Sequence, residues 1–436
     1  MGHPGRSALI LPTRFDLMAD ALTRILFQKL VSMSGDDYEE GEIVIDKGRI
    51  VETRSGTSES FAGVTQDWSD CLILPGFVNA HCHLSLSGLQ GKVARQERFV
   101  DWIESVVTEN AALSWADRVE ALHREARTLI ESGVTALGDY FSYPELLVEY
   151  QTLPFRQLLF LETLGFQSAL AGEKARSVED LLQEHPAGAG SLIRLAVAPH
   201  APYSVSPDLF KELKKLADKM NCRVSCHVAE VAAETQFLSQ GEGDFLKLLH
   251  QREVYDPSWT PPGVSPVRYL EQLGVLQDMV TIHLNYLEKS DLNRLAESNA
   301  SAVFCPGSTR WFGRRTWMPV KDLLDRGISV GLGTDSLASN DSLNFLYEIR
   351  LSEEMVPELH RSEILWLATV GGSQALNIEK LGLEPGQPAD LIGFRFRSSE
   401  DDWWDLPFDR DRMQVDFSMV SGEFIFQKPN NKGRNQ

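Results

Sequence analysis

The chain has 436 residues, of which 43% are hydrophobic and 24% charged, and its formal net charge is −20. This length exceeds that of one compact sandwich or helix bundle and suits a large barrel with a smaller module, while the composition is typical of a soluble globular enzyme. The acidic balance argues against a nucleic-acid-binding protein, which would cluster Lys and Arg on one face.

The cysteines and the apolar runs indicate the cellular compartment. Five cysteines are present and none forms a Cys-x-x-Cys pair, which fits a reducing cytoplasm better than a disulfide framework. Residues 1–7 lack the basic and then apolar order of a secretory signal, and no apolar run approaches the roughly 20 residues that span a bilayer. We therefore expect a cytoplasmic protein that binds neither membranes nor nucleic acid, and whether it forms a homo-oligomer stays open.

The N-terminal part has the pattern of β-structure. Residues 42–51 predict two short strands around an Asp-Lys-Gly turn. The polar stretch 54–70, which is rich in Ser, Gly and Thr, predicts a loop. The apolar run 72–80 predicts a buried strand that leads into a pair of histidines.

The middle of the chain alternates short apolar runs with amphipathic stretches. Helices are predicted at residues 118–130 and 207–220. Further strands are predicted at residues 134–137, 192–198, 223–228, 279–284, 301–305 and 328–332. Strands that alternate with helices over about 300 residues indicate βα units and a parallel barrel.

The C-terminal part returns to β-structure. Residues 390–394 and 415–426 predict strands, and residues 428–436 form a polar tail that we expect to be disordered. The first and last parts of the chain are expected to build one small β-sandwich beside the barrel. The division that we predict is residues 1–72, 73–385 and 386–436.

A His-Cys-His sequence follows the first predicted barrel strand. Residues two apart on a strand point the same way, so His81 and His83 face one side and Cys82 faces the other. Two neutral imidazoles on one face suit zinc or a similar divalent ion. A His-x-His pair alone is weak support, because most such pairs bind no metal.

Three more histidines stand at the ends of later predicted strands, namely His200, His227 and His283. Barrel enzymes place their catalytic groups at this edge. Glu230 follows His227 by three residues and could act as a general base beside a metal-bound water. The alternative is that Glu230 is only an acid in the first turn of the next helix, where the helix dipole favours it.

Asp335 lies in a Gly-Thr-Asp-Ser segment at the end of the last predicted strand. It is either a further group of the metal site or the N-cap of the next helix. The candidate residues come from the first, fifth, sixth and last strands, and ligands on different strands are what a barrel needs to surround one ion.

Other titratable residues are assigned structural or surface positions. Asp139 also ends a predicted strand and is either a site residue or an inward structural acid, whereas His123 is expected to be exposed. The histidines expected on the surface are His3, His185, His250 and His360.

In combination, these motifs resemble the amidohydrolase superfamily. The matching segments are Pro75 to His83, Pro199 to Tyr203, His227 to Glu230, His283, and Gly333 to Ser336, within a resemblance that runs from about Leu72 to Ile392. The chain is similar to the branch that holds adenosylhomocysteine/methylthioadenosine, aminofutalosine, cytosine and guanine deaminases and the triazine hydrolases.

The resemblance implies one divalent ion, zinc before iron or manganese, held by His81, His83, His227 and Asp335. A single ion is implied because binuclear members carry a bridging lysine near the fourth strand, where this chain has His200. Glu230, His283 and Asp335 are implied as catalytic groups, and His200 and Glu230 as substrate contacts. The fold implied is a distorted (β/α)8 TIM barrel with a small composite β-sandwich built from both termini.

The chain departs from these relatives at two places. Residues 304–309 replace a segment in which relatives carry His or Asn, and Glu109 is not aligned with the ribose-binding acid of the adenosyl deaminases. Both departures argue against a nucleoside substrate but leave the hydrolytic chemistry unaffected.

We therefore predict a hydrolytic deaminase that releases ammonia from an aminated purine-, nucleoside- or pyrimidine-like ring. Glu230 would take a proton from water and hand it to the ring, His283 would orient the water, and Asp335 would pass a proton to the departing amine. The alternatives are a hydrolase that removes another group, such as chloride from a triazine, or cleaves a cyclic amide, and a non-catalytic binding barrel.

Three arginines follow the seventh predicted strand, namely Arg310, Arg314 and Arg315. A guanidinium offers a planar fork for carboxylate or phosphate. The cluster either binds an anionic group of the substrate or forms a solvated surface loop, and both interpretations stay open.

Overall fold

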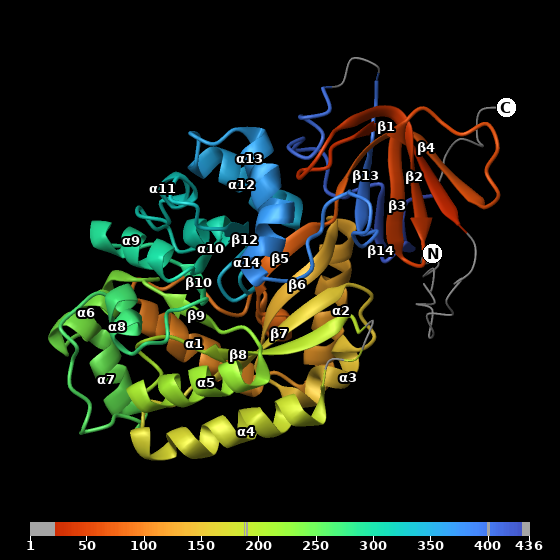
Figure 1. Ribbon diagram of the computed structural model, residues 1–436. Coiled ribbons are helices and arrows are strands. Elements are labelled where there is room, and N and C mark those ends of the chain that lie inside the picture. The colour runs from red at the N-terminus through yellow and green to blue at the C-terminus, as the bar shows by residue number, and fades with distance from the viewer. Residues whose placement is uncertain (1–21, 187, 189–190, 399–401, 430–436) are drawn as a thin grey trace, which may run out of the picture.

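The computed structural model describes residues 22–186, 188, 191–398 and 402–429. These residues form a seven-stranded sheet and an eight-stranded sheet with helices around the latter (Figure 1). His3 and most of the predicted C-terminal tail lie outside the described residues. No helix within the described ranges is long and apolar enough to cross a bilayer.

The first sheet is built from both ends of the chain, as predicted. Its order is β15-β14-β13-β4-β1-β2-β3, and its apolar core includes Ile25, Trp68 and Phe417. The bounds are β1 Thr23–Leu30, β2 Tyr38–Asp46, β3 Arg49–Ser55, β4 Val64–Pro75, β13 Leu391–Arg395, β14 Phe417–Val420 and β15 Glu423–Gln427.

The loop predicted over residues 54–70 is partly wrong, because β4 begins at Val64. This half of β4 pairs in parallel with β1 and exposes most of its polar side chains, while Trp68 is buried. The first half of β4 is mostly polar and solvent-exposed, so the sequence there lacks the apolar run that would predict a strand. The Asp-Lys-Gly turn is confirmed, since Lys47 and Gly48 join β2 and β3 with positive φ angles of 48° and 76°.

The second sheet is a parallel barrel of eight strands in the order β8-β7-β6-β5-β12-β11-β10-β9. A bridge between Val197 and Val224 closes it. The bounds are β5 Phe77–Cys82, β6 Val134–Phe141, β7 Arg156–Thr163, β8 Ile193–Pro199, β9 Ser225–Val228, β10 Val280–His283, β11 Ser301–Phe304 and β12 Val330–Leu332. The predicted (β/α)8 barrel with a composite β-sandwich is confirmed.

Strand β7 is the one barrel strand absent from the sequence-based prediction. Its apolar run covers only Leu158 to Leu161, between Gln157 and Glu162. A run this short cannot be told from part of a buried helix by periodicity alone.

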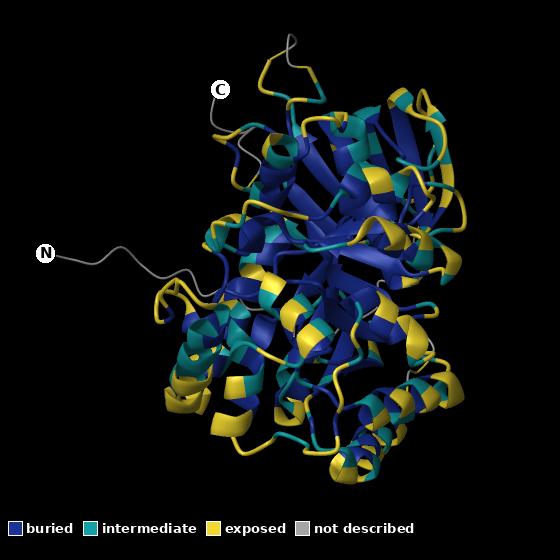
Figure 2. Cartoon of the chain, turned by 90° about the vertical axis from the view of Figure 1, so that its left-hand side faces the viewer, coloured by how far each residue is buried: buried dark blue, intermediate teal, exposed yellow. Residues whose placement is uncertain are grey.

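Helices cover the outside of the barrel, and Figure 2 shows their exposed faces around buried strands. The predicted helix at 207–220 matches α5, which is capped by the Ser206 hydroxyl accepting from the Leu209 amide. The bounds are α1 Phe99–Ala112, α2 Trp115–Glu131, α3 Leu147–Tyr150, α4 Ala171–Glu184, α5 Pro207–Met220, α6 Ala232–Gln240, α7 Asp244–Gln251, α8 Pro266–Gln272, α9 Lys289–Glu297, α10 Pro306–Trp311, α11 Val320–Leu324, α12 Phe345–Met355, α13 Arg361–Trp366 and α14 Gly372–Leu376.

Gly76 joins the two sheets, between the end of β4 and the start of β5. Its amide donates to the Asp390 carbonyl at 3.0 Å. A Cβ on Gly76 would lie 2.0 Å from Oγ1 and 2.6 Å from Cβ of Thr135, which is buried on β6. The close approach of β4–β5 to β6 therefore requires a glycine here and sets where β5 delivers its histidines.

We predict that Gly76→Ala lowers the free energy of unfolding by about 1–3 kcal/mol, because the added methyl overpacks a buried contact. The measurement is urea denaturation. Gly172→Ala is the matched control: it lies within α4, where the nearest atom, Nη1 of Arg176, is 3.5 Å away. That variant should be neutral or up to about 1 kcal/mol more stable, since Ala favours helix. Equal effects of the two substitutions would contradict the packing argument.

Candidate metal centre and catalytic pocket

The residues singled out by the sequence come together at the carboxyl ends of the barrel strands. His81 lies in β5 with His83 directly after it, and His227 and His283 lie in β9 and β10. His200 follows β8 and Asp335 follows β12 by three residues. His283 and Asp335 have positive φ angles of 76° and 60°. This backbone conformation is unfavourable for residues other than glycine, and such residues are often found at functional sites.

The facing atoms have the spacing of a ligand shell. Nε2 of His83 lies 3.4 Å from Nε2 of His227. Oδ1 of Asp335 lies 3.6 Å from Nε2 of His81 and 3.7 Å from Nε2 of His83. Two ligands about 2.1 Å from a tetrahedral ion lie roughly 3.4 Å apart, so one divalent ion fits between these atoms.

The hydrogen-bonding state of the imidazoles also fits a metal. Both ring nitrogens of His81 and Nδ1 of His83 are buried and have no hydrogen-bond partner among the described residues. Nδ1 of His227 lies 2.9 Å from the His200 carbonyl; by donating there it leaves Nε2 a free lone pair toward the cluster. Burial lowers the pKa of His83 to about 4 and that of His227 well below its ordinary value, so both rings are neutral at pH 7, as ligation requires.

Asp335 carries its charge into this cluster. Burial alone would raise its pKa, but the neighbouring imidazoles of His81, His283 and His83 hold the pKa well below its ordinary value. Its two oxygens accept hydrogen bonds from the Ser336 amide at 2.8 Å and the Ser339 hydroxyl at 2.9 Å. The N-cap alternative is wrong, because the next helix, α12, is capped by the side chain of Asn344.

Glu230 points into the site rather than along the next helix. Helix α6 begins only at Ala232, and the Glu230 side chain is 6% exposed. Its Oε1 lies 2.7 Å from Nη2 of Arg314 and 3.8 Å from Nε2 of His283. Burial raises the pKa of Glu230 to about 7, although Arg314 lowers it. The helix-start interpretation of this acid is therefore wrong.

The three arginines after β11 have different surroundings. The Arg314 side chain is only 5% exposed, and its guanidinium packs 4.2 Å from the ring centre of Phe312. Arg310 is exposed and pairs with Glu354 on α12 at 2.9 Å. Arg315 is exposed and forms no ion pair within the described ranges. Only Arg314 enters the site, where it is the cation beside Glu230.

A cavity of about 610 Å³ opens over the candidate site. His83, His200, His227, Glu230, His283 and Asp335 form its floor. Its walls are mostly apolar and come from α1, α7 and the segment after β7; they include Phe99, Trp102, Ile103, Val106, Leu164, Phe166, Phe245, Leu248 and Leu249. A flat ring fits such apolar walls. Polar side chains also line the cavity outside the candidate site, among them Asn110, Lys174 and Arg252.

Glu162 is a site residue that the sequence analysis missed. It lies in β7, lines the cavity, and has Oε1 3.8 Å from Nε2 of His200. Nδ1 of His200 lies 2.6 Å from the Ser204 hydroxyl, and burial lowers the pKa of His200 to about 4. An acid at the carboxyl end of a barrel strand is a signal for a site residue, but that signal required predicting β7.

The remaining expectations have mixed outcomes. Of the two interpretations of Asp139, the contacts favour the structural acid: it accepts from the Leu84 amide at 2.7 Å and from Tyr150, which fixes the chain just after His83. His123 is half-buried and lies 2.8 Å from Glu149, so its predicted exposure is wrong. The surface positions of three histidines are confirmed for His185, His250 and His360. Glu109 does not line the cavity.

Known proteins are similar to this chain in sequence and in fold. The amidohydrolase family profile matches residues 72–425. The chain is 30% identical over 405 residues to the 5-methylthioadenosine/S-adenosylhomocysteine deaminase of Nitratidesulfovibrio vulgaris, which covers 86% of this chain and 84% of that protein.

Two solved structures show the same fold. The aminofutalosine deaminase of Helicobacter pylori is 23% identical, with a TM-score of 0.80 over 93% of this chain and 100% of that chain. Atrazine chlorohydrolase from Arthrobacter aurescens, complexed with zinc, is 20% identical, with a TM-score of 0.79 over 93% and 95% of the two chains.

The profile covers most of the chain, from within β4 to within β15, and includes the whole eight-stranded barrel. The resemblance inferred from the His-Cys-His, His-x-x-Glu and Gly-Thr-Asp-Ser motifs is thereby confirmed. The chain belongs to the amidohydrolase family and is a hydrolase that acts on carbon–nitrogen bonds.

Proposed function

We propose that the chain is a metal-dependent deaminase that removes an amino group from an adenosine-like ring. The observation that carries this proposal is the buried, Arg314-paired Glu230 beside the facing side chains of His81, His83, His227 and Asp335. The deaminase name of the relative at 30% identity supports the same reaction. The five free cysteines support a cytoplasmic location.

His81, His83, His227 and Asp335 would hold one divalent ion, with zinc the first candidate because imidazole and carboxylate suit it. When bound there, such an ion lowers the pKa of a coordinated water toward about 7. His283 remains outside this set, although its ring nitrogen also lies near those of His81 and His227.

The proton transfers fall to Glu230 and Asp335. A pKa of about 7 lets the Glu230 carboxyl accept a proton near neutral pH and return it to a ring nitrogen of the substrate. His283, with Nε2 3.8 Å from Oε1 of Glu230, is placed to orient the attacking water. Asp335, which is ionised at rest, would take the proton of the hydroxyl group newly bound to the ring carbon and pass it to the amino group, so that the carbon–nitrogen bond breaks and ammonia departs.

Substrate binding divides between the floor and the walls of the cavity. His200, Glu230 and Glu162 would contact the polar edge of the ring. The mostly apolar walls favour a substituent with substantial apolar surface. A cavity of about 610 Å³ exceeds the need of a bare base and lies within the range that holds small drug-sized ligands.

Metal content tests the ligand set. We predict about one equivalent of divalent ion per chain, because one N/O cluster accommodates it, and loss of ammonia release when a chelator removes it. Elemental analysis of a freshly purified sample provides the measurement. Two ions per chain, or none with activity retained, would refute this assignment.

Glu230→Gln should retain the metal while kcat falls by about 10²–10⁴-fold, the usual contribution of a general acid–base group. His283→Ala should also retain the metal and lose activity. The assay is ammonia release from aminated purines, nucleosides, pyrimidines and triazines, with metal content measured in parallel. Turnover within a few-fold of the unmodified enzyme would remove Glu230 from the mechanism, and metal loss in His283→Ala would make His283 a ligand. Product formation without ammonia would favour removal of another group.

Arg314→Met should move the acidic limb of the kcat/KM profile to higher pH by roughly one to three pH units. Glu230 must be ionised to accept a proton, and removing the cation 2.7 Å away raises its pKa. Arg314→Lys should restore part of the difference, and the exposed Arg315→Met is the control. An unchanged limb in Arg314→Met would show that the ion pair does not govern Glu230.

A further inference from the structure

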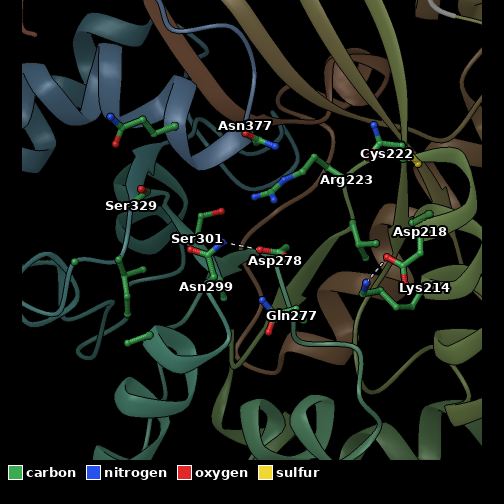
Figure 3. A pocket seen from close by; sticks show the side chains of 18 of the residues that line it. Lys214, Asp218, Cys222, Arg223, Gln277, Asp278, Asn299, Ser301, Ser329 and Asn377 are labelled. Carbon is green, nitrogen blue, oxygen red and sulfur yellow. Dashed lines mark hydrogen bonds and ion pairs between the residues drawn. The ribbon is translucent and has the colours of Figure 1, made fainter.

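A second cavity, of about 640 Å³, lies at the opposite end of the barrel (Figure 3). Its lining residues come from the amino ends of β8 to β12 and from neighbouring helices, for example Arg194, Val224, Ser301 and Ser329. None of its lining residues lines the catalytic cavity. Nothing in the proposed deaminase reaction uses it.

Cations predominate among the charged side chains of this basal cavity. Four are basic and two acidic, namely Arg194, Lys214, Arg223, Arg326, Asp218 and Asp278. Lys214 pairs with Asp218, and Arg326 lies 3.8 Å from Asp322 outside the cavity. Asp278 accepts from Nδ2 of Asn299 at 2.6 Å. Arg194 and Arg223 therefore have no ion pair within the residues that the structure describes.

Arg223 is the less exposed of the two, and part of its guanidinium group is buried without a partner in the described part of the chain. Its Nε is buried and has no hydrogen-bond partner among the described residues. Its Nη2 donates to the Ala375 carbonyl at 3.3 Å, and that carbonyl already accepts from Ser301 at 2.6 Å. Burial lowers the pKa of the Arg223 guanidinium, against a smaller effect of Asp278. Figure 3 shows the side chain extending into the cavity.

The rest of the lining is also polar. The amides of Gln277 and Asn377 and the hydroxyl of Ser329 face the cavity (Figure 3), and Asn221 also lines it. Few of the lining side chains are apolar. An apolar ligand would gain little from such walls. A planar guanidinium with free donors instead suits an oxyanion, and phosphate above all.

We propose that the basal cavity is a binding site for a small phosphate-bearing metabolite. The phosphate binds between Arg223 and Arg194, and the amides take the polar remainder of the molecule. The volume lies within the range of small-molecule sites. In a chain with a net charge of −20, this cavity gathers four basic side chains against two acidic ones.

The proposal is tested by calorimetric titration of the metal-loaded enzyme with ribose 5-phosphate, inorganic phosphate and ribose, at ionic strength held constant with chloride. Saturable binding of both phosphate compounds is expected, the sugar phosphate binding more tightly, with no heat from ribose. Arg223→Gln should weaken binding about tenfold or more, as loss of a charge-assisted hydrogen bond does. Arg176→Gln removes the same charge from an exposed position on α4 and should change binding less than about twofold.

Absence of saturable binding to the unmodified enzyme overturns the proposal, and so does equal weakening by Arg223→Gln and Arg176→Gln. If Arg223→Gln does not fold, the exposed Arg194→Gln takes its place and should weaken binding about threefold or more. Binding that disappears in Glu230→Gln but survives in Arg223→Gln would locate the phosphate in the catalytic cavity and also refute the basal site.

Discussion

The carbonyl oxygen of His200 accepts two hydrogen bonds from His227, one from the backbone amide and one from Nδ1 of the ring, each at 2.9 Å. The first joins the ends of β8 and β9, where the barrel closes. The second fixes the tautomer of His227 and turns Nε2 toward His83. One acceptor atom thus joins two strands beside the point of barrel closure and also orients a candidate ligand, so the fold itself contributes to the geometry of the site.

Burial of charge is the main cost of this arrangement. Glu230 and Arg314 are both nearly inaccessible, and a buried ion pair repays its desolvation only when the geometry is good and the remaining polar atoms are satisfied. Nη1 of Arg314 has no partner in the described part of the chain, so the pair is not fully compensated. Glu234 adds a further buried acid, whose carboxylate accepts from the amides of Ala229 and Glu230 and whose pKa burial raises to about 8. These contacts hold the Glu230 backbone in place. The buried acid Glu234 therefore positions Glu230 rather than adding to the stability of the fold.

The sequence predicts the barrel and the five candidate strand-end histidines because their signals are local. An apolar run followed directly by His or Asp places the side chain at one edge of a parallel sheet, whatever the rest of the chain does. Glu162 and Arg314 carry no such signal. The first depends on β7, whose apolar run is too short to identify, and the second is one of three similar arginines that differ only in where the loop after β11 directs them. Likewise, the choice of Asn344 rather than Asp335 as the cap of the next helix depends on the path of residues 336–343, which lie between them.

The two ends of the barrel differ in the walls that surround their charged groups. At the carboxyl end, aromatic and aliphatic side chains enclose Glu230, so its ion pair with Arg314 acts in a medium of low effective dielectric, where a neighbouring charge changes a pKa strongly. At the amino end, amides and hydroxyls surround Arg223, so that a bound anion would keep polar contacts on all sides. Apolar walls suit chemistry that moves a proton between fixed groups, because they hold solvent away from it. The polar walls of the basal cavity suit the binding of a polar ligand that does not react there. The same parallel strands therefore support two sites whose chemistry is set by the residues that flank each end.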